Sequence, residues 1–157
     1  MKELKLFGSN KVALVDDEDY ERLIGFTWYV RKNNCVQRFH IRLKGGSQKS
    51  ISLASEIMHQ LEQMFDHKDR DGLNNQKYNL RPCNQSQNMM NRTKTKNCSS
   101  IYKGVCWSKL MRKWHARIKI NGKVIHLGYF TDEKVAAIAY NNKAVELFKE
   151  FANLNNV

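Results

Sequence analysis

The last third of the chain alternates apolar and basic residues in a pattern typical of half-exposed strands. Between 113 and 120, Trp114, Ala116 and Ile118 point to one side of an extended chain and basic residues to the other. The sequence therefore predicts strands over 104–108, 113–120 and 123–127, with a hairpin turn at Asn121-Gly122. A helix from about 132 to 150 should follow, with an apolar stripe at helical spacing: Ala137, Tyr140, Ala144, Leu147, Phe148 and Phe151. This stripe should cover the apolar sheet face and leave the basic face exposed.

The first third is predicted to be rich in β-structure. We expect strands over 12–15, 27–31, 36–43 and 50–53, with a hairpin turn at 44–47, where the sequence reads Lys-Gly-Gly-Ser. The acidic run 16–19 stands where a short helix would begin, since carboxylates complement the positive end of the helix dipole. This run is similar to a metal site, but a solvated helix start is the favoured interpretation.

The middle of the chain mixes both kinds of element. Residues 58–92 predict a helix end, a strand, a polar loop, a short strand at 78–81 and a helix that begins near Asn84. The polar stretch 93–100 lacks apolar periodicity and is predicted to be a linker. We therefore expect the α+β class, with a first domain over 1–92 and a second over 101–157.

Charge narrows the choice of partner. The 157 residues include 27 Lys and Arg against 15 Asp and Glu, a net charge of +12 at pH 7. Residues 72–131 contain no acidic residue, and 93–157 carry 12 of the basic residues against four acidic ones. Such a distribution indicates a phosphate-facing surface, with a merely solvated basic face as the alternative.

Cysteine spacing and hydropathy argue against a zinc-binding protein and against a membrane-spanning or secreted one. Cys35, Cys83, Cys98 and Cys106 form no C-x-x-C pair, so we expect reduced, structural cysteines and no structural zinc. No apolar run approaches the ~20 residues that span a bilayer. The N-terminal residues lack the features of a signal peptide, so we expect a cytoplasmic protein without a membrane partner.

The candidate chemistry lies between 58 and 92. Asp66 and His67 end a predicted strand, Asn79 follows His67 by twelve residues, and Asn88 follows nine residues later on a predicted helix. This arrangement resembles the HNH nuclease motif, a ββα-metal finger, in its His-Asn-Asn variant. The resemblance implies that His67, Asn79 and Asn88 are the catalytic positions and that Asp66 and Asn88 bind the metal.

The residue types suit that chemistry. Carboxylate and amide oxygens are appropriate ligands for Mg²⁺, with Mn²⁺ as an alternative, and a neutral imidazole can accept a proton from water at neutral pH. Asn79 is expected to orient the loop or the imidazole, and Arg81 and Arg92 are candidate phosphate contacts. An EF-hand interpretation of 69–72 fails, because Tyr78 would occupy the position that requires a bidentate Glu.

The C-terminal pattern points to DNA. The run YKGVCWSKLMRKWHARIKINGKVIHLGYF, followed by AAIAY and ANLN, resembles the APETALA-type (ethylene-response-factor) DNA-binding domain. The resemblance assigns DNA contacts to Lys103, Lys113, Arg117, Lys119 and His126, with lower expectations for Trp107, Lys109 and His115. Cys106, Ser108 and Val124 depart from positions that are often Arg in the plant proteins. We expect Trp114 and Tyr129 to pack in the core.

The whole chain is similar to HNH homing endonucleases of phages and mobile introns that carry this appended domain. The resemblance implies a site-specific DNA endonuclease that acts on double-stranded DNA as a monomer or homodimer, with one divalent metal and no small-molecule cofactor. One departure is the short stretch of six residues, Gln60–Phe65, before the Asp-His pair. The alternative is therefore a DNA-binding protein with a decayed nuclease centre. An RNA-binding module is a more distant third, because no stacking-aromatic signature is evident.

Overall fold

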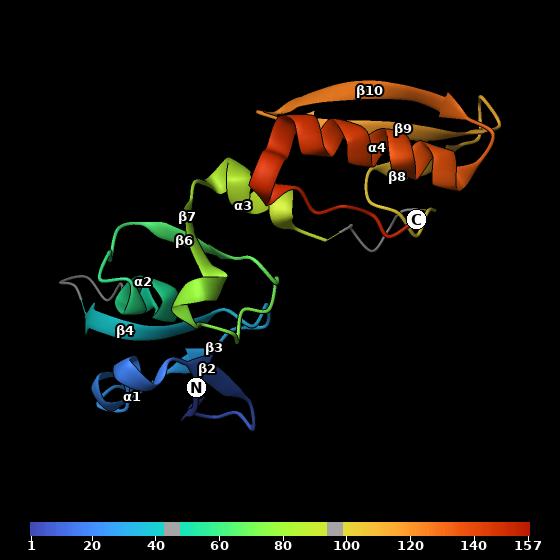
Figure 1. The fold of residues 1–157 in the computed structure, drawn as a ribbon. Helices are drawn as coiled ribbons and strands as arrows, with labels where there is room; N and C mark the ends of the chain where they lie inside the picture. The colour runs from blue at the N-terminus through green and yellow to red at the C-terminus, as the bar shows by residue number, and fades with distance from the viewer. Residues whose placement is uncertain (43–47, 94–98) are drawn as a thin grey trace. The chain divides into compact units, whose positions relative to one another are not determined.

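The protein has the α+β architecture that the sequence predicts. A computed structural model describes residues 1–42, 48–93 and 99–157, which form small antiparallel sheets and short helices (Figure 1). Two compact units divide the chain, Met1–Asn84 and Gln85–Val157. The predicted turn at 44–47 and most of the predicted linker at 93–100 lie outside the described residues. Among the described helices, none combines the length and apolar character needed to cross a bilayer.

The first unit begins with a hairpin and a helix. β1 (Lys2–Lys5) pairs antiparallel with β2 (Val12–Val15), and α1 (Asp17–Leu23) follows. The predicted strand over 12–15 and the predicted helix start are confirmed, whereas β1 has too few apolar residues to show alternation. The expectation of a solvated acidic run is wrong for Asp19, which is only 4% exposed. This carboxylate is buried because Arg22 and Lys77 supply opposite charge.

A three-stranded sheet and a second helix continue this unit. β4 (Val36–Arg42) lies between β3 (Tyr29–Val30) and β5 (Gln48–Ser52), and both pairings are antiparallel. α2 (Leu53–Ile57) begins after Ser52, whose hydroxyl accepts a hydrogen bond from the backbone N–H of Ser55 at 3.0 Å. The predicted strand over 50–53 therefore ends one residue early, since Ser52 caps a helix there.

A second hairpin completes the first unit. β6 (Met64–His67) pairs antiparallel with β7 (Leu80–Cys83), and the connection contains a 3-10 helix, η1 (Lys77–Asn79). The strand that the sequence places at 78–81 begins instead at Leu80. A buried core holds these elements together and includes Leu4, Val15, Leu23, Trp28, Leu53, Ile57, Phe65 and Leu80.

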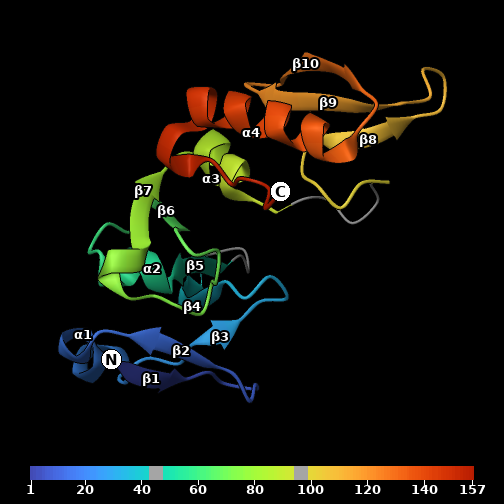
Figure 2. The same ribbon diagram turned by 45° about the vertical axis from the view of Figure 1, so that its right-hand side comes forward.

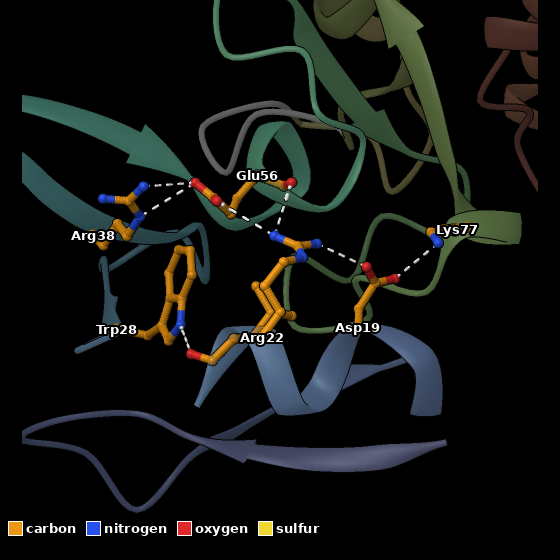
Figure 3. Close-up of polar contacts among 7 residues, drawn as sticks. Asp19, Arg22, Trp28, Arg38, Glu56 and Lys77 are labelled. Atoms are coloured by element: carbon orange, nitrogen blue, oxygen red, sulfur yellow. Dashed lines mark hydrogen bonds and ion pairs between the residues drawn. The ribbon is translucent and has the colours of Figure 1, made fainter. Parts of the chain in front are cut away.

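An ion-pair network crosses this unit (Figure 3). Arg22 contacts Asp19 at 2.8 Å and Glu56 at 3.3 Å, while Arg38 contacts Glu56 at 2.8 Å and Lys77 contacts Asp19 at 3.0 Å. Burial of the Asp19 carboxyl opposes its ionisation, but the contacts with Arg22 and Lys77 outweigh burial and lower its pKa. The network joins α1, α2, β4 and η1 through side chains that are far apart in sequence.

The second unit confirms the strand and helix pattern of the last third. α3 (Gln85–Asn91) precedes β8 (Val105–Ser108), β9 (Lys113–Ile120) and β10 (Lys123–Phe130), which form an antiparallel sheet with β9 in the centre. α4 (Glu133–Phe148) and a 3-10 turn, η2 (Lys149–Phe151), follow. α4 lies along one face of the sheet (Figures 1 and 2), where its buried alanines permit close packing against β9.

The β9–β10 turn matches its prediction. Asn121 and Gly122 have φ values of +48° and +78°, which a type I′ hairpin turn requires at both central positions. Further along β10, the register shifts between His126 and Gly128. This β-bulge reverses the alternation, so that Phe130 packs toward α4 while Tyr129 points to the other face.

Candidate functional site

The β6–β7 hairpin presents the Asp-His pair at its end. His67 is the last residue of β6 and lies opposite Leu80, while Asp66 lies opposite Arg81. The backbone N–H of Lys68 donates to the Asn79 carbonyl at 2.9 Å and extends the ladder by one step. The chain then leaves the sheet as a loop that returns at η1. The hairpin therefore fixes the backbone on both sides of His67.

Asp66 forms a close ion pair with Arg81. The Asp66 Oδ2 atom accepts from Arg81 Nη2 at 2.7 Å and from Arg81 Nε at 3.0 Å. The two side chains are only 7% and 11% exposed. Directly opposed residues of antiparallel strands share a face, which explains the contact. Arg81, a candidate phosphate contact by sequence, thus compensates the charge of Asp66.

His67 is oriented by an asparagine that the sequence analysis did not single out. Its Nε2 atom lies 3.2 Å from the Oδ1 atom of Asn75, a side chain of 1% exposure. Asn75 donates its amide to the Gly72 carbonyl at 3.1 Å, which assigns its oxygen to His67. Because an amide oxygen only accepts, Nε2 carries the proton in this contact and Nδ1 is the basic nitrogen of the neutral ring.

The Asn75 backbone is anchored on β2. Its N–H donates to the Leu14 carbonyl at 2.8 Å, and the Leu14 N–H donates to the Leu73 carbonyl at 2.8 Å. These bonds attach the loop to a strand about sixty residues earlier in the sequence. Asn-rich turns are common, and no local signal distinguishes Asn75 from Asn74 as the partner of an imidazole.

Asn79 holds the inside of the same loop. Its side chain is 2% exposed, donates to Asp69 Oδ1 at 2.9 Å and to the Asn74 carbonyl at 2.7 Å, and accepts from the Asp69 N–H at 3.0 Å. Burial opposes ionisation of Asp69, but hydrogen bonds from Asp71, Asn79 and Asn74 lower its pKa overall. Asn79 therefore orders the loop between Asp69 and Asn74, which agrees with an orienting role.

The remaining residues of the expected nuclease site lie on or after α3. Asn88 is half-buried on α3, which packs against η2 within the second unit. Arg92 is exposed and donates to the Met89 sulfur at 3.2 Å. Across the described segments, no cluster of three or more His, Cys, Asp or Glu side chains forms a metal site.

The outer face of the C-terminal sheet gathers most of the expected DNA contacts. Exposed or half-buried side chains at alternate positions share this face, which we call the basic face: Cys106, Ser108, Lys113, His115, Arg117, Lys119, Val124, His126 and Tyr129. It brings together Lys113, Arg117, Lys119 and His126, as the alternation predicts. None of its members is acidic. A three-stranded sheet with such a face has the charge that phosphate contacts require.

Three residues near this face have surroundings of their own. The prediction that Tyr129 packs in the core is wrong, because the bulge before Gly128 turns the ring outward, where it is 45% exposed. Lys103 is half-buried, and its ammonium donates to the Met90 carbonyl. Trp107 lies on the α4 side, where its ring makes an edge contact with Trp114 at 5.1 Å between centroids. For Tyr129, the sequence signal that could have indicated the bulge is Gly128, a glycine within a strand.

Trp114 packs against the core of the second unit, as predicted. Cys35, Cys83 and Cys106 are free thiols, and Cys98 lies outside the described residues. Burial raises the pKa of Cys83 to about 11, so this thiol remains protonated at neutral pH.

Comparison with known proteins does not identify a family for this chain. The chain matches no family profile, and it has no match among curated proteins.

Proposed function

We propose that this protein is a site-specific DNA endonuclease of the HNH homing type. The observation that carries the proposal is the oriented imidazole of His67, which follows Asp66 in sequence at the end of the β6–β7 hairpin. A general base needs a basic nitrogen with a pKa near neutrality and a fixed direction, and the Asn75 contact provides that direction. The basic face of the second unit supplies a surface for DNA.

The proposed reaction is hydrolysis of a phosphodiester bond. His67 Nδ1 accepts a proton from the attacking water, while Asn75 maintains the ring tautomer through Nε2. Asp66 offers a carboxylate oxygen of the kind that Mg²⁺ prefers, and a bound Mg²⁺ would supply electrostatic stabilisation of charge on the scissile phosphate. Asn79 acts at a distance, by ordering the loop that carries Asn75.

The basic face would provide affinity and target choice. Lys113, Arg117 and Lys119 are exposed on the central strand, with a spacing that allows contacts to a phosphate backbone. A β-sheet can also enter the major groove and read base edges. One hairpin contains one catalytic centre, so a monomer would nick one strand and a homodimer could cut both.

A specific observation favours a second candidate, a DNA-binding protein that does not cut. Arg81 places two guanidinium nitrogens on one oxygen of Asp66, and this pair is nearly buried. The Arg81 guanidinium therefore already neutralises the Asp66 carboxylate, which a metal would need as its charged ligand. Cleavage would require Asp66 to exchange Arg81 for a metal ion.

The test is cleavage of supercoiled plasmid that carries candidate target DNA, with Mg²⁺ or with a chelator. We expect metal-dependent conversion to open-circle or linear DNA by the wild type and none by His67→Ala, because the proton acceptor is lost. Gln60→Ala is the control, since Gln60 is exposed and its only described contacts are through the backbone. DNA binding measured in parallel should be unchanged in both variants.

The outcomes separate the two candidates. Intact plasmid with tight, salt-sensitive binding by the wild type supports the DNA-binding protein without nuclease activity. Cleavage by His67→Ala at the wild-type rate removes His67 from the mechanism. An absence of binding to any DNA contradicts both candidates.

A further inference from the structure

Three aromatic rings form a column across the basic face. His115 stacks on His126 with centroids 4.9 Å apart and on Tyr129 with centroids 4.8 Å apart, at interplanar angles of 14° and 23°. His115 lies on β9, and the other two rings lie on β10 on either side of the bulge. We call this set the ring column. The bulge creates it, because regular alternation would have turned Tyr129 toward α4.

A hydrogen bond joins the two imidazoles. The Nε2 atom of His115 lies 2.8 Å from the Nδ1 atom of His126. One of these nitrogens must donate and the other accept, so the bond exists only while the accepting ring is unprotonated. The pair can therefore hold at most one positive charge without losing this contact. A second proton would break the bond and separate the rings.

The surroundings of the pair are basic on β9, and the other two strands of the face add no acidic side chain. Arg117 is the register partner of His126, and Lys113 and Lys119 lie on the same side of β9. β8 contributes Cys106 opposite His115, and β10 contributes Tyr129, while α4 packs on the other side of the sheet. No carboxylate occurs on the three strands. Partial burial, His126 and Arg117 all lower the pKa of His115.

We propose that the ring column is a phosphate-contact site of the basic face, which takes up a proton when it binds the DNA backbone. This inference rests on the proposed DNA binding; it gives His115 and His126 a joint, proton-linked role and adds Tyr129 to the site. A phosphate placed beside the column offsets the charge of Arg117 and its neighbours, and so favours the imidazolium form. Tyr129 stacks on His115 and so restricts the direction in which the protonated imidazole presents its N–H groups.

The sign of the pH dependence follows from linkage. Because phosphate favours the protonated pair, the complex binds more protons than the free protein at pH values near the ordinary histidine pKa of about 6.5. Affinity therefore rises as the pH falls through this range. The steepest possible change is about tenfold in Kd per pH unit for one proton, and the change ends once the free protein is itself protonated.

The experiment measures proton uptake directly, with the full-length protein, a chelator and a duplex of fixed length. Calorimetry at about pH 6.5 in two buffers of different ionisation enthalpy gives the number of protons bound with the DNA. We expect uptake of a fraction of one proton for the wild type, and nearly none for the double variant His115→Gln/His126→Gln, which has no imidazole in the ring column. At about pH 8, above the ordinary histidine pKa of about 6.5, the double variant should bind within about threefold of the wild type.

Two controls identify the source of the proton. His67→Ala should retain the full uptake, which excludes a contribution from the proposed nuclease centre. His59→Asn should also retain it, since His59 is exposed in the first unit and asparagine tolerates its φ of +53°. Uptake that persists in the double variant His115→Gln/His126→Gln overturns the proposal, even if DNA binds well.

A second duplex of unrelated sequence distinguishes phosphate from base. A phosphate contact predicts the same uptake for both duplexes, whereas uptake with one sequence alone would indicate a base contact and overturn the assignment. If no duplex binds at any pH, the proposed function fails. If DNA binds without proton uptake, only this inference fails.

Discussion

Arg22 is the residue on which two buried carboxylates depend. Its guanidinium contacts Asp19 and Glu56, whose side chains are 5% and 14% exposed. Desolvated charges are tolerated when oppositely charged groups lie within hydrogen-bond distance, and removing Arg22 leaves Asp19 with Lys77 alone and Glu56 with Arg38 alone. This residue links α1 to α2 (Figure 3).

The variant Arg22→Met should lower the free energy of unfolding by about 3 kcal/mol, because Asp19 and Glu56 lose a shared cation. Urea denaturation at neutral pH measures the loss. Lys2→Met is the matched control: Lys2 pairs with Glu21 at 3.1 Å, but both side chains are exposed, so the expected loss is below about 1 kcal/mol. Equal losses in the two variants would contradict the role of burial.

Acidification should reduce the difference in the free energy of unfolding between the wild type and Arg22→Met. The pKa of Asp19 is lowered in the folded state, so its ionised form contributes stability above the unfolded value of about 3.9. That contribution is lost as the pH falls through the folded pKa. Arg22→Lys, which retains the charge, should recover part of the stability at neutral pH.

At the scale of elements, one glycine sets how closely α4 approaches the sheet. Gly104 precedes β8 with φ of +78°, and its carbonyl accepts from the Arg117 N–H at 2.8 Å. A Cβ atom at this position would lie 2.1 Å from the Tyr140 ring and 2.7 Å from the Arg117 carbonyl. The sheet and the helix therefore meet where only glycine fits.

Gly104→Ala and Gly122→Ala form a matched pair, because both glycines have φ of +78° and Gly122 has open space around it. Gly122→Ala should cost about 1–2 kcal/mol from left-handed backbone strain. Gly104→Ala should cost about 1–3 kcal/mol more through overpacking. Denaturation of both variants measures the difference, and hydrogen exchange of the β9 amides locates it. Similar losses would show that Tyr140 moves aside without cost.

At the scale of the whole molecule, the net charge of +12 is unevenly placed. In the first unit, acidic residues pair with Arg22, Arg38, Lys77 and Arg81, whereas the basic face has no acidic member. An uncompensated basic surface on one unit gives a polyanion a preferred place to bind. The excess charge therefore bears on partner binding more than on folding.

Arg117→Gln should weaken DNA binding and reduce the slope of log K against log salt concentration by about 0.9, the value for one lost phosphate contact. Fluorescence anisotropy over a series of salt concentrations provides the slope. Lys134→Gln removes the same charge from an exposed position on α4 and should leave the slope nearly unchanged. Equal slope changes would place the DNA on a different surface.

Much of the second unit follows from local sequence patterns. Alternation in 113–120, the Asn121-Gly122 turn and the stripe on α4 predict the strands, their connection and the buried side of the helix. These features depend on residues a few positions apart, and the period of the pattern identifies the element. In the first unit, the same reasoning predicts β2 and the start of α1 but misses β1, where apolar residues are too few.

The sequence by itself determined the α+β class, the basic alternation and the position of the Asp-His pair at a strand end. Only the tertiary structure decided which side chains meet: Arg81 with Asp66, Asn75 with His67, and Tyr129 with His115. The physical reason is that these contacts depend on strand register, on a bulge and on a loop bound to β2. Such pairings join residues distant in sequence, which local periodicity does not specify.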